Sequence, residues 1–411
     1  MTKSYSLLRR NPNYRKLWLA SSGSILGDWF NQVALGQVTL SLTHSPAAMG
    51  MVLLCRSLPA VLLGPFVSPL IDRYPKKMIM FISDLIRAAV VILFPMAILD
   101  HRGTFLYAGA ALLGLSGVMF APAQQAAFPL IVSNKDLAPA NALSSGTYGF
   151  LSILGAAGGG IVSSLLNPVV SFLINSLSYV WSAFYIFQIH MPENTDENKK
   201  KETYFDSLKE GFKEAAGNKA AKAIILIGIS WGLAGGGYAI LIPILGDMGY
   251  GMGGLGIGTL YAIDGLGVLL GALFVQRFIG SNHKRANWWY GAAYLTQAFF
   301  FALLAQSAVF IAGASMLLLM RFSSGIIIPL DSYLMQVHTK PEVRGRIFSL
   351  HNSTYSGVMQ LSYASMGYLY ETVGIPVMGL VIGFVSFLCG LSWLLQMKTF
   401  TSPDSIRDFR L

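Results

Sequence analysis

Residues 222–246 read KAIILIGISWGLAGGGYAILIPILG, an apolar run whose one charged residue is the lysine at its start. An α-helix rises 1.5 Å per residue, so about 20 apolar residues are enough to cross the ~30 Å hydrocarbon core of a bilayer. A membrane β-strand would need only about ten residues and would alternate polar with apolar side chains. The run therefore predicts a transmembrane helix.

Comparable runs follow one another along the whole chain. We count twelve, at 14–42, 46–71, 78–99, 104–132, 140–166, 168–190, 222–246, 254–279, 287–307, 308–333, 345–370 and 374–398. Only 12% of the 411 residues are charged, whereas a soluble globular chain carries roughly a quarter. The fold class that we predict is an all-α integral membrane protein with 12 transmembrane helices.

The long polar segment of the chain lies between the sixth and seventh runs and divides them six and six. We expect a six-helix bundle at 1–190, a cytoplasmic linker at 191–221, a second bundle at 222–398 and a cytoplasmic tail at 399–411. Residues 204–216 of the linker have the composition of an amphipathic helix on the membrane surface. Residues 114–137 and 321–343 share an order of glycine, apolar stretch, proline and polar residues, which favours two pseudo-symmetric bundles.

The basic residues predict the orientation, because lysine and arginine favour the cytoplasmic side of short loops. Of the 29 Lys and Arg residues, 25 fall in the two termini and in alternate loops on one side, and Arg102 alone falls on the other. We therefore expect both termini in the cytoplasm of a bacterial plasma membrane. This asymmetry explains the net charge of +10 without a nucleic-acid partner.

Several classes of site and segment have no support in the sequence. Cys55 and Cys389 both lie in apolar runs near opposite ends of the chain, so we expect neither a disulfide framework nor a metal site. Residues 1–16 are polar and basic, so we expect no removable signal peptide. The chain lacks a GxxxxGK[ST] sequence, which disfavours an ATP-driven pump.

Four segments resemble the major facilitator superfamily, and within it the drug:proton antiporter group that includes macrolide-efflux and enterobactin-exporter proteins. They are LWLASSGSILGDWF (17–30), SPLIDRYPKKMIM (68–80), FAPAQQAAFPLIVSNKDLAPANAL (120–143) and VRGRIFSL (343–350). The resemblance covers essentially the whole chain. It implies a transporter rather than an enzyme, with two six-helix bundles, alternating access to a central site, and a proton gradient in place of any cofactor.

The resemblance also implies a conformational latch in the loop after the second helix. The matching residues are Asp72, Arg73, Lys76 and Lys77, although Ser68 and Pro75 stand where the family usually has glycine. The alternative interpretation is that these charges only set the topology.

Ionisable residues inside the expected spans are candidates for proton coupling, because each costs ~2.5–3.5 kcal/mol to insert and usually faces a cavity or a partner. We take Asp28 as the coupling carboxyl with Arg56 as its partner, and Asp264 and Arg321 as further candidates. Asp84 and Arg87 lie three residues apart on one helix face, so we expect them to neutralise each other. Mutual neutralisation is the alternative for the others, and Arg321 could pair with Asp264.

The expected cavity is wide and apolar with few polar points, which suits an amphiphilic substrate. Its candidate residues are Trp29, Asn31, Gln32, Gln124, Tyr148, Asn175, Trp231, Tyr238, Tyr261 and Tyr355. Aromatic residues near helix ends can instead anchor the protein at the membrane interface. Gly146, Gly155 and Gly159 follow the antiporter spacing of a helix hinge, although close helix packing explains them equally well.

We therefore expect a monomeric transporter that exchanges protons for an amphiphilic small molecule, such as a drug, a macrolide-like compound or a siderophore, among membrane lipids. A uniporter, an importer or a lysolipid carrier of the same fold is an alternative. A membrane sensor or scaffold is an alternative from another class.

Overall fold

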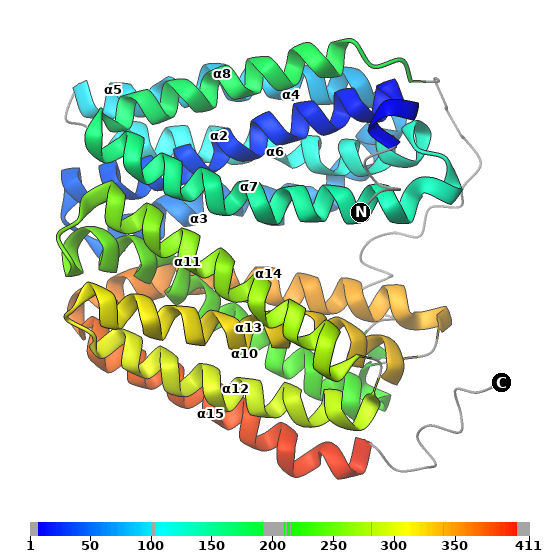
Figure 1. The fold of residues 1–411 in the computed structure, drawn as a ribbon, viewed down its shortest axis with the longest axis vertical. Coiled ribbons are helices and arrows are strands. Elements are labelled where there is room, and N and C mark those ends of the chain that lie inside the picture. Colours follow the sequence, from blue (N-terminus) through cyan, green and yellow to red (C-terminus); the bar gives the residue numbers. More distant parts are fainter. Residues whose placement is uncertain are drawn as a thin grey trace. The chain divides into compact units, whose positions relative to one another are not determined.

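A computed structural model describes residues 7–99, 103–191, 209, 212–213, 215–280, 282–339 and 341–400. The described residues are helical and contain no strand (Figure 1). Most of the expected linker, all but two residues of the expected tail, and Arg102 lie outside them.

The first half of the chain contributes six long helical segments among the described residues. They are α2 (Pro12–Thr43), α3 (Pro46–Arg73), α4 (Lys76–Val91) continued by α5 (Leu93–Leu99), α6 (Thr104–Ile131), α7 (Leu137–Leu165) and α8 (Pro168–Phe187). The Asn11 side chain caps α2 by accepting the Tyr14 N–H at 2.9 Å, and Asn167 caps α8 in the same way.

The second half contributes six more in its described part. They are α10 (Lys219–Ile244) continued by the π-helical turn Leu245–Gly249, α11 (Gly253–Phe274) continued by the π-helical turn Val275–Ile279, α12 (His283–Gln306), α13 (Phe310–His338), α14 (Pro341–Thr372) and α15 (Ile375–Phe400). The twelve segments confirm the predicted all-α membrane fold.

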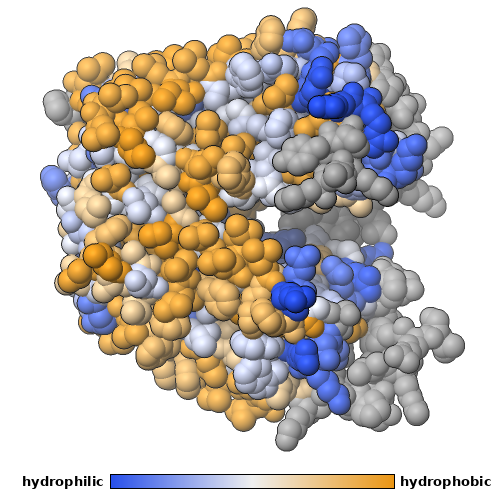
Figure 2. Space-filling model, in the orientation of Figure 1, coloured by the Kyte–Doolittle hydropathy of each residue, from blue (hydrophilic) through white to orange (hydrophobic). Residues whose placement is uncertain are grey.

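Nine helical segments of the described chain are long and apolar enough to cross a membrane. The three long helices outside that set are α2, α12 and α14, whose sequences carry more polar residues. A helix that packs on protein or lines a polar cavity does not need a wholly apolar surface. Large hydrophobic side chains such as Leu62, Phe184 and Leu395 are exposed, and apolar side chains cover the helix sides in Figure 2.

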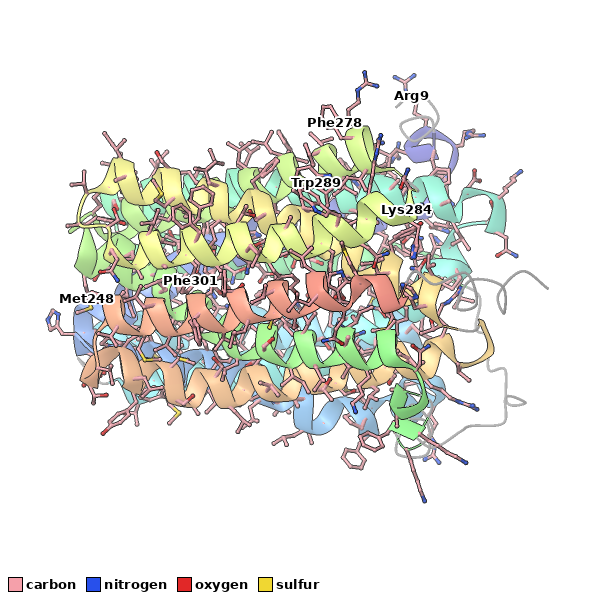
Figure 3. All side chains as sticks on the ribbon, turned by 90° about the horizontal axis from the view of Figure 1, so that it is seen from below. Arg9, Met248, Phe278, Lys284, Trp289 and Phe301 are labelled. Atoms are coloured by element: carbon pink, nitrogen blue, oxygen red, sulfur yellow. The ribbon has the colours of Figure 1, made fainter. Side chains whose placement is uncertain are left out.

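Contacts between Cα atoms divide the chain into two compact units. Unit 1 comprises residues 1–199 and 242–262, and unit 2 comprises 200–241 and 263–411. In each unit most described lysines and arginines lie at one end of the helices, which we call the basic end, whereas Arg56, Arg87 and Arg321 lie within helices. In unit 2, for example, Lys284 and Trp289 lie toward that end (Figure 3).

Unit 1 is built around α2, which packs against α7 and α8, while α4 packs against α6 and α8. Its apolar core forms two clusters, one at the basic end around Leu17 and Met80, the other toward the opposite end around Leu35 and Val91. Residues between these clusters on α2 and α4 include the expected intramembrane charges.

The tip of the α10–α11 hairpin belongs to unit 1, at the end opposite the basic end. Gly258 approaches Gly160 of α7 so closely that an added Cβ would lie 2.9 Å from the Gly160 nitrogen. Nearby, the Leu255 N–H donates to Ser164 Oγ at 2.6 Å. Small residues permit this close approach.

Unit 2 is built around α12, which packs on α13 and α15. Its apolar cluster surrounds Tyr290, Leu330 and Trp393. On the neighbouring seam, Gly228 and Gly232 of α10 face His351 and Tyr355 of α14.

Candidate functional site

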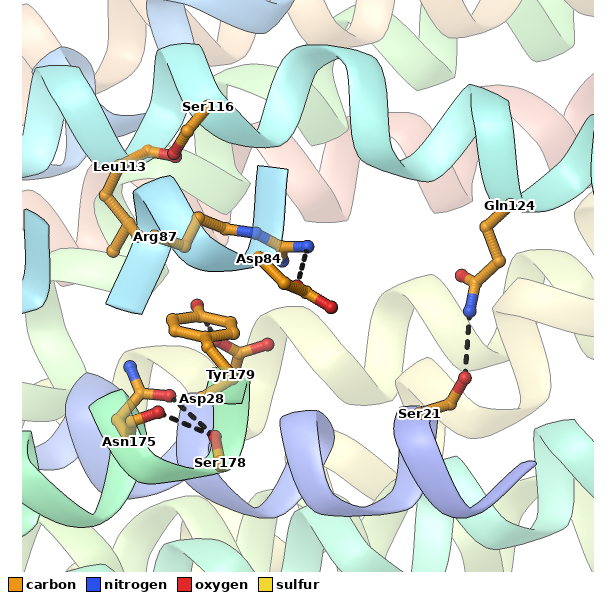
Figure 4. Close-up of polar contacts among 10 residues, drawn as sticks. All are labelled: Ser21, Asp28, Asp84, Arg87, Leu113, Ser116, Gln124, Asn175, Ser178 and Tyr179. Carbon is orange, nitrogen blue, oxygen red and sulfur yellow. Dashed lines mark hydrogen bonds and ion pairs between the residues drawn. The ribbon is translucent and has the colours of Figure 1, made fainter. Parts of the chain in front are cut away.

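Asp28 lies in the middle of α2, and its carboxylate accepts a hydrogen bond from the hydroxyl of Tyr179 on α8 (Figure 4). Tyr179 is buried, whereas Asp28 is half-buried. In the part of the chain that the structure describes, no lysine or arginine forms an ion pair with Asp28. The carboxylate therefore depends on a neutral donor.

The expected ion pair between Asp84 and Arg87 is present on α4, with Arg87 Nη2 2.5 Å from Asp84 Oδ1. Both side chains are buried. The Arg87 guanidinium also lies 3.8 Å from the centre of the Phe120 ring and 4.7 Å from that of Tyr179. Tyr179 thus contacts Asp28 through its hydroxyl and Arg87 through its ring face, which links the lone carboxylate to the ion pair.

Arg56, the expected partner of Asp28, instead donates from Nη1 to Gln32 Oε1 at 2.6 Å. Gln32 Nε2 lies 3.4 Å from the hydroxyl of Tyr261, and the Tyr261 ring packs edge-on against Trp29 at 5.4 Å. The structure therefore brings Trp29, Gln32 and Tyr261 of the expected cavity together, around Arg56 rather than around Asp28.

A cleft of about 830 Å³ opens between α2, α6 and α7, in the half of unit 1 nearer the basic end. It is lined by Tyr14, Leu17, Trp18, Ser21, Ser22, Ile25, Gln124, Gln125, Phe128, Pro129, Leu137, Asn141, Ser144, Ser145, Thr147 and Tyr148. None of these side chains is charged. Gln124 and Tyr148 were among the expected cavity residues, and Gln124 Nε2 donates to Ser21 Oγ at 2.8 Å.

Two expected cavity residues, Asn31 and Asn175, are fully buried instead. Asn175 lies at the contact of α8 with α2, where its neighbours are Gly27 and Ser178. The side chain of Asn31 has no hydrogen-bond partner among the described residues. Sequence could not reveal this, because an asparagine in an apolar run has the same signature on a cavity wall and in a helix contact.

In unit 2, Asp264 of α11 and Arg321 of α13 form an ion pair. The hydroxyl of Tyr238 on α10 donates to Asp264 Oδ1 at 2.7 Å, and the Arg321 guanidinium lies 4.9 Å from the Tyr238 ring centre. Tyr238 therefore joins an acid and a base, as Tyr179 does in unit 1. The remaining expected cavity residues, Trp231 and Tyr355, pack with their ring centres 6.3 Å apart.

A further charged cluster was missed by sequence reasoning. Asp331 of α13 accepts the Tyr290 hydroxyl at 2.6 Å and lies 3.2 Å from His351 Nε2. The expected span ended at residue 333, which left Asp331 at its edge, but α13 continues to His338. The signal was available in the sequence, because Asp331 lies within the expected span at 308–333.

The expected latch remains a prediction. Arg73 ends α3 and is exposed, Lys76 begins α4, and the Lys77 ammonium lies 5.1 Å from the centre of the Phe187 ring. The side chain of Asp72 lies outside the described part of the chain.

The expected hinge glycines occupy different surroundings. Gly155 and Gly159 pack α7 against Trp29 and Phe30 of α2, so a side chain at either position would collide with its neighbours. A Cβ at Gly146 would meet no described atom within 4 Å. Two of the three glycines therefore serve close helix packing.

Comparison with known proteins gives a family and several relatives. Residues 17–363 match the model of the Major Facilitator Superfamily. The chain is 27% identical over 387 residues to the putative bacilysin exporter BacE of Bacillus subtilis, covering 92% of this chain and 93% of that protein. It is 26% identical over 373 residues to macrolide efflux protein A of Streptococcus pyogenes, covering 87% and 89%.

Solved structures show the same fold at low sequence identity. The nucleoside transporter NupG superposes with a TM-score of 0.70 and 14% identity, covering 94% of this chain and 99% of that one. A bacterial homologue of the iron transporter ferroportin, in an inward-facing state, gives a TM-score of 0.71 and 14% identity, covering 93% and 98%.

Proposed function

Given that this chain belongs to the major facilitator superfamily and is a multi-pass membrane transporter, we propose that it exports an amphiphilic small molecule in exchange for protons. The names of its relatives support export, because they include a putative bacilysin exporter and a macrolide efflux protein. Each of these relatives is covered over most of its length, so the likeness extends to the whole transporter.

The proposed membrane is the bacterial plasma membrane, with the basic end of the helices in the cytoplasm. The distribution of Lys and Arg supports this orientation. The cleft between α2, α6 and α7 then lies in the cytoplasmic half, where a compound to be exported would enter.

The lining of that cleft supports an amphiphilic substrate without a required charge. Trp18, Phe128 and Tyr148 offer aromatic surface, and Gln124 and Asn141 offer amide groups. Apolar walls with a few polar points fix the orientation of a ligand without demanding one chemical class.

Asp28 is the proposed coupling group, and its single described hydrogen bond, to Tyr179, is the observation that carries this assignment. Asp84 already has a contacting cation, whereas Asp28 has none among the described residues. Protonation of Asp28 removes a charge from the membrane interior. The neutral carboxyl group then no longer requires a hydrogen-bond donor to stabilise an anion. One proton moving through 100 mV yields ~2.3 kcal/mol, enough for a gradient of roughly fiftyfold.

The test uses the full-length protein in proteoliposomes with an imposed pH gradient, and bacilysin and radiolabelled erythromycin as probes. Wild-type protein should release protons across the membrane when a transported probe is added. Asp28→Asn should abolish that proton flux, and the control Asp136→Asn, in the short turn Asn134–Asp136 between α6 and α7, should keep it. If the rate of probe flux through the wild-type protein is the same with and without the pH gradient, proton coupling is wrong and a uniporter is favoured.

A further inference from the structure

Three helices of unit 2 converge on Asp331. Tyr290 of α12 donates to Oδ1 at 2.6 Å, and Nε2 of His351 on α14 lies 3.2 Å from Oδ2. Each carboxylate oxygen therefore has one partner, and each partner comes from a different helix. The side chains of Asp331 and His351 are 20% and 12% exposed, so solvent reaches a cluster that is otherwise enclosed.

No lysine or arginine forms an ion pair with Asp331 in the described part of the chain. Arg321, on the same helix as Asp331, is held by Asp264 and Tyr238. Among the described residues, the His351 imidazole is therefore the group that balances the charge of the Asp331 carboxylate when it is protonated.

The other titratable groups that face the cluster come from the helices packed around it. They are Tyr290 and Tyr294 of α12, whose ring centres lie 5.2 Å apart, Tyr355 of α14 and Cys389 of α15. From α10 the contact is Gly228, where an added Cβ would lie 2.8 Å from His351 Nδ1. Tyrosine and cysteine are neutral near pH 7, so they leave the carboxylate and the imidazole as the pair that changes charge.

We propose that Asp331 and His351 form a second proton-binding site of this transporter, with the His351 ring as the group that takes up the proton. Histidine is the side chain whose charge changes between about pH 5 and 8. When Nε2–H donates to Asp331, the lone pair of the neutral ring is on Nδ1, which is buried and has no partner among the described residues. A proton adds there, and the net charge of the pair goes from negative to zero.

The site is placed where protonation would alter a helix contact. The His351 ring lies between Asp331 of α13 and Gly228 of α10, so it takes part in both seams of α14. A protonated ring adds the attraction of a cation to its hydrogen bond with the carboxylate, and a neutral ring lacks that attraction. Proton release therefore loosens α14 from α13. The use of this site in transport rests on the proposed proton coupling, whereas its titration does not.

The first test is a histidine NMR titration of full-length protein in lipid nanodiscs, with ring-labelled histidine. The His351 resonance is assigned by its loss in His351→Gln, with the exposed His190→Gln as the matched control. We expect this resonance to move with pH and its pH response to differ in Asp331→Asn, because the charge of the neighbouring carboxylate is lost. A resonance that does not move with pH, or an unchanged pH response in Asp331→Asn, would overturn the site.

The second test separates this site from the proposed function. In the proteoliposome assay, His351→Gln should lower the number of protons moved per probe molecule about twofold, because one of two proton sites is lost while Asp28, the site that coupling requires, remains. His190→Gln should leave the ratio unchanged. Absence of any probe-driven proton flux in wild type would sink the proposed function, while the NMR result would still decide the proton site. An unchanged ratio in His351→Gln would overturn its role in coupling.

Discussion

The two units neutralise their intramembrane charges in different ways. In unit 1 the ion pair lies within one helix, since Asp84 and Arg87 are three residues apart on α4, and Asp28 is left with a tyrosine. In unit 2 the ion pair joins two helices, α11 and α13, and Asp331 is left with a tyrosine and a histidine.

The two arrangements respond differently to helix movement. An ion pair within one helix survives when neighbouring helices shift, because its two members move together. An ion pair between helices must be broken or re-formed when those helices separate. We therefore propose Asp28 as the group of unit 1 that responds to protons, whereas unit 2 offers two interhelical contacts for this role.

The largest expected effect comes from breaking the fixed pair of unit 1. Arg87→Ala leaves the Asp84 carboxylate buried without a partner, which should lower the free energy of unfolding by about 3–5 kcal/mol. Denaturant titration in mixed micelles measures it, with the exposed Arg73→Ala as the control. A loss below about 1 kcal/mol would mean that Asp84 is not held as a buried anion.

The interhelical pair of unit 2 should cost less to break. Arg321 and Asp264 are 16% and 15% exposed, so water partly compensates a lone charge. We expect Arg321→Gln to lower the free energy of unfolding by about 1–3 kcal/mol, with most of it recovered in the double variant with Asp264→Asn. A double-mutant cycle measures the coupling, and additive losses would contradict a direct pair.

The two bridging tyrosines give a matched pair of smaller effects. Tyr179→Phe removes the donor to Asp28 but keeps the ring beside Arg87, and Tyr238→Phe does the same for Asp264 and Arg321. Each should lower the free energy of unfolding by about 1–2 kcal/mol. Of the two variants, Tyr179→Phe alone should also change the pH profile of probe export, because Asp264 is paired with Arg321 whereas Asp28 has no contacting cation among the described residues. Equal changes in both pH profiles would remove the distinction between the units.

The smallest expected effect lies in the cleft of unit 1. Gln124→Ala removes an amide that lines the cleft and donates to Ser21. Loss of one hydrogen bond between this amide and a transported probe, about 0.5–1.5 kcal/mol, should raise the KM for the probe up to about tenfold. Stability should be unchanged, because the residue lines an open cleft. Gln306→Ala, at the far end of α12, is the matched control. An unchanged KM would argue that the probe binds elsewhere.

Much of the fold followed from local patterns. Run length predicted the helices, and spacing on one helix predicted the Asp84–Arg87 pair. Helices α10 and α11 each end in a π-helical turn. The spacing of apolar residues in the sequence does not predict these turns.

Partners distant in sequence were harder to predict. Tyr179 lies 151 residues from Asp28, and an apolar run gives no sign of which aromatic residue will face a given acid. The sequence also does not predict that the tip of the α10–α11 hairpin belongs to unit 1. The Gly160–Gly258 contact depends on how the helices pack and cannot be read from either helix alone.

We propose that protonation of Asp28 couples transport to the proton gradient, and a comparison of two transport modes can decide whether it does. Asp28→Asn proteoliposomes should exchange a transported probe, radiolabelled erythromycin or bacilysin, at close to the wild-type rate when no gradient is present. They should fail to accumulate it when a pH gradient is imposed. Accumulation at the wild-type level in this variant would contradict the account.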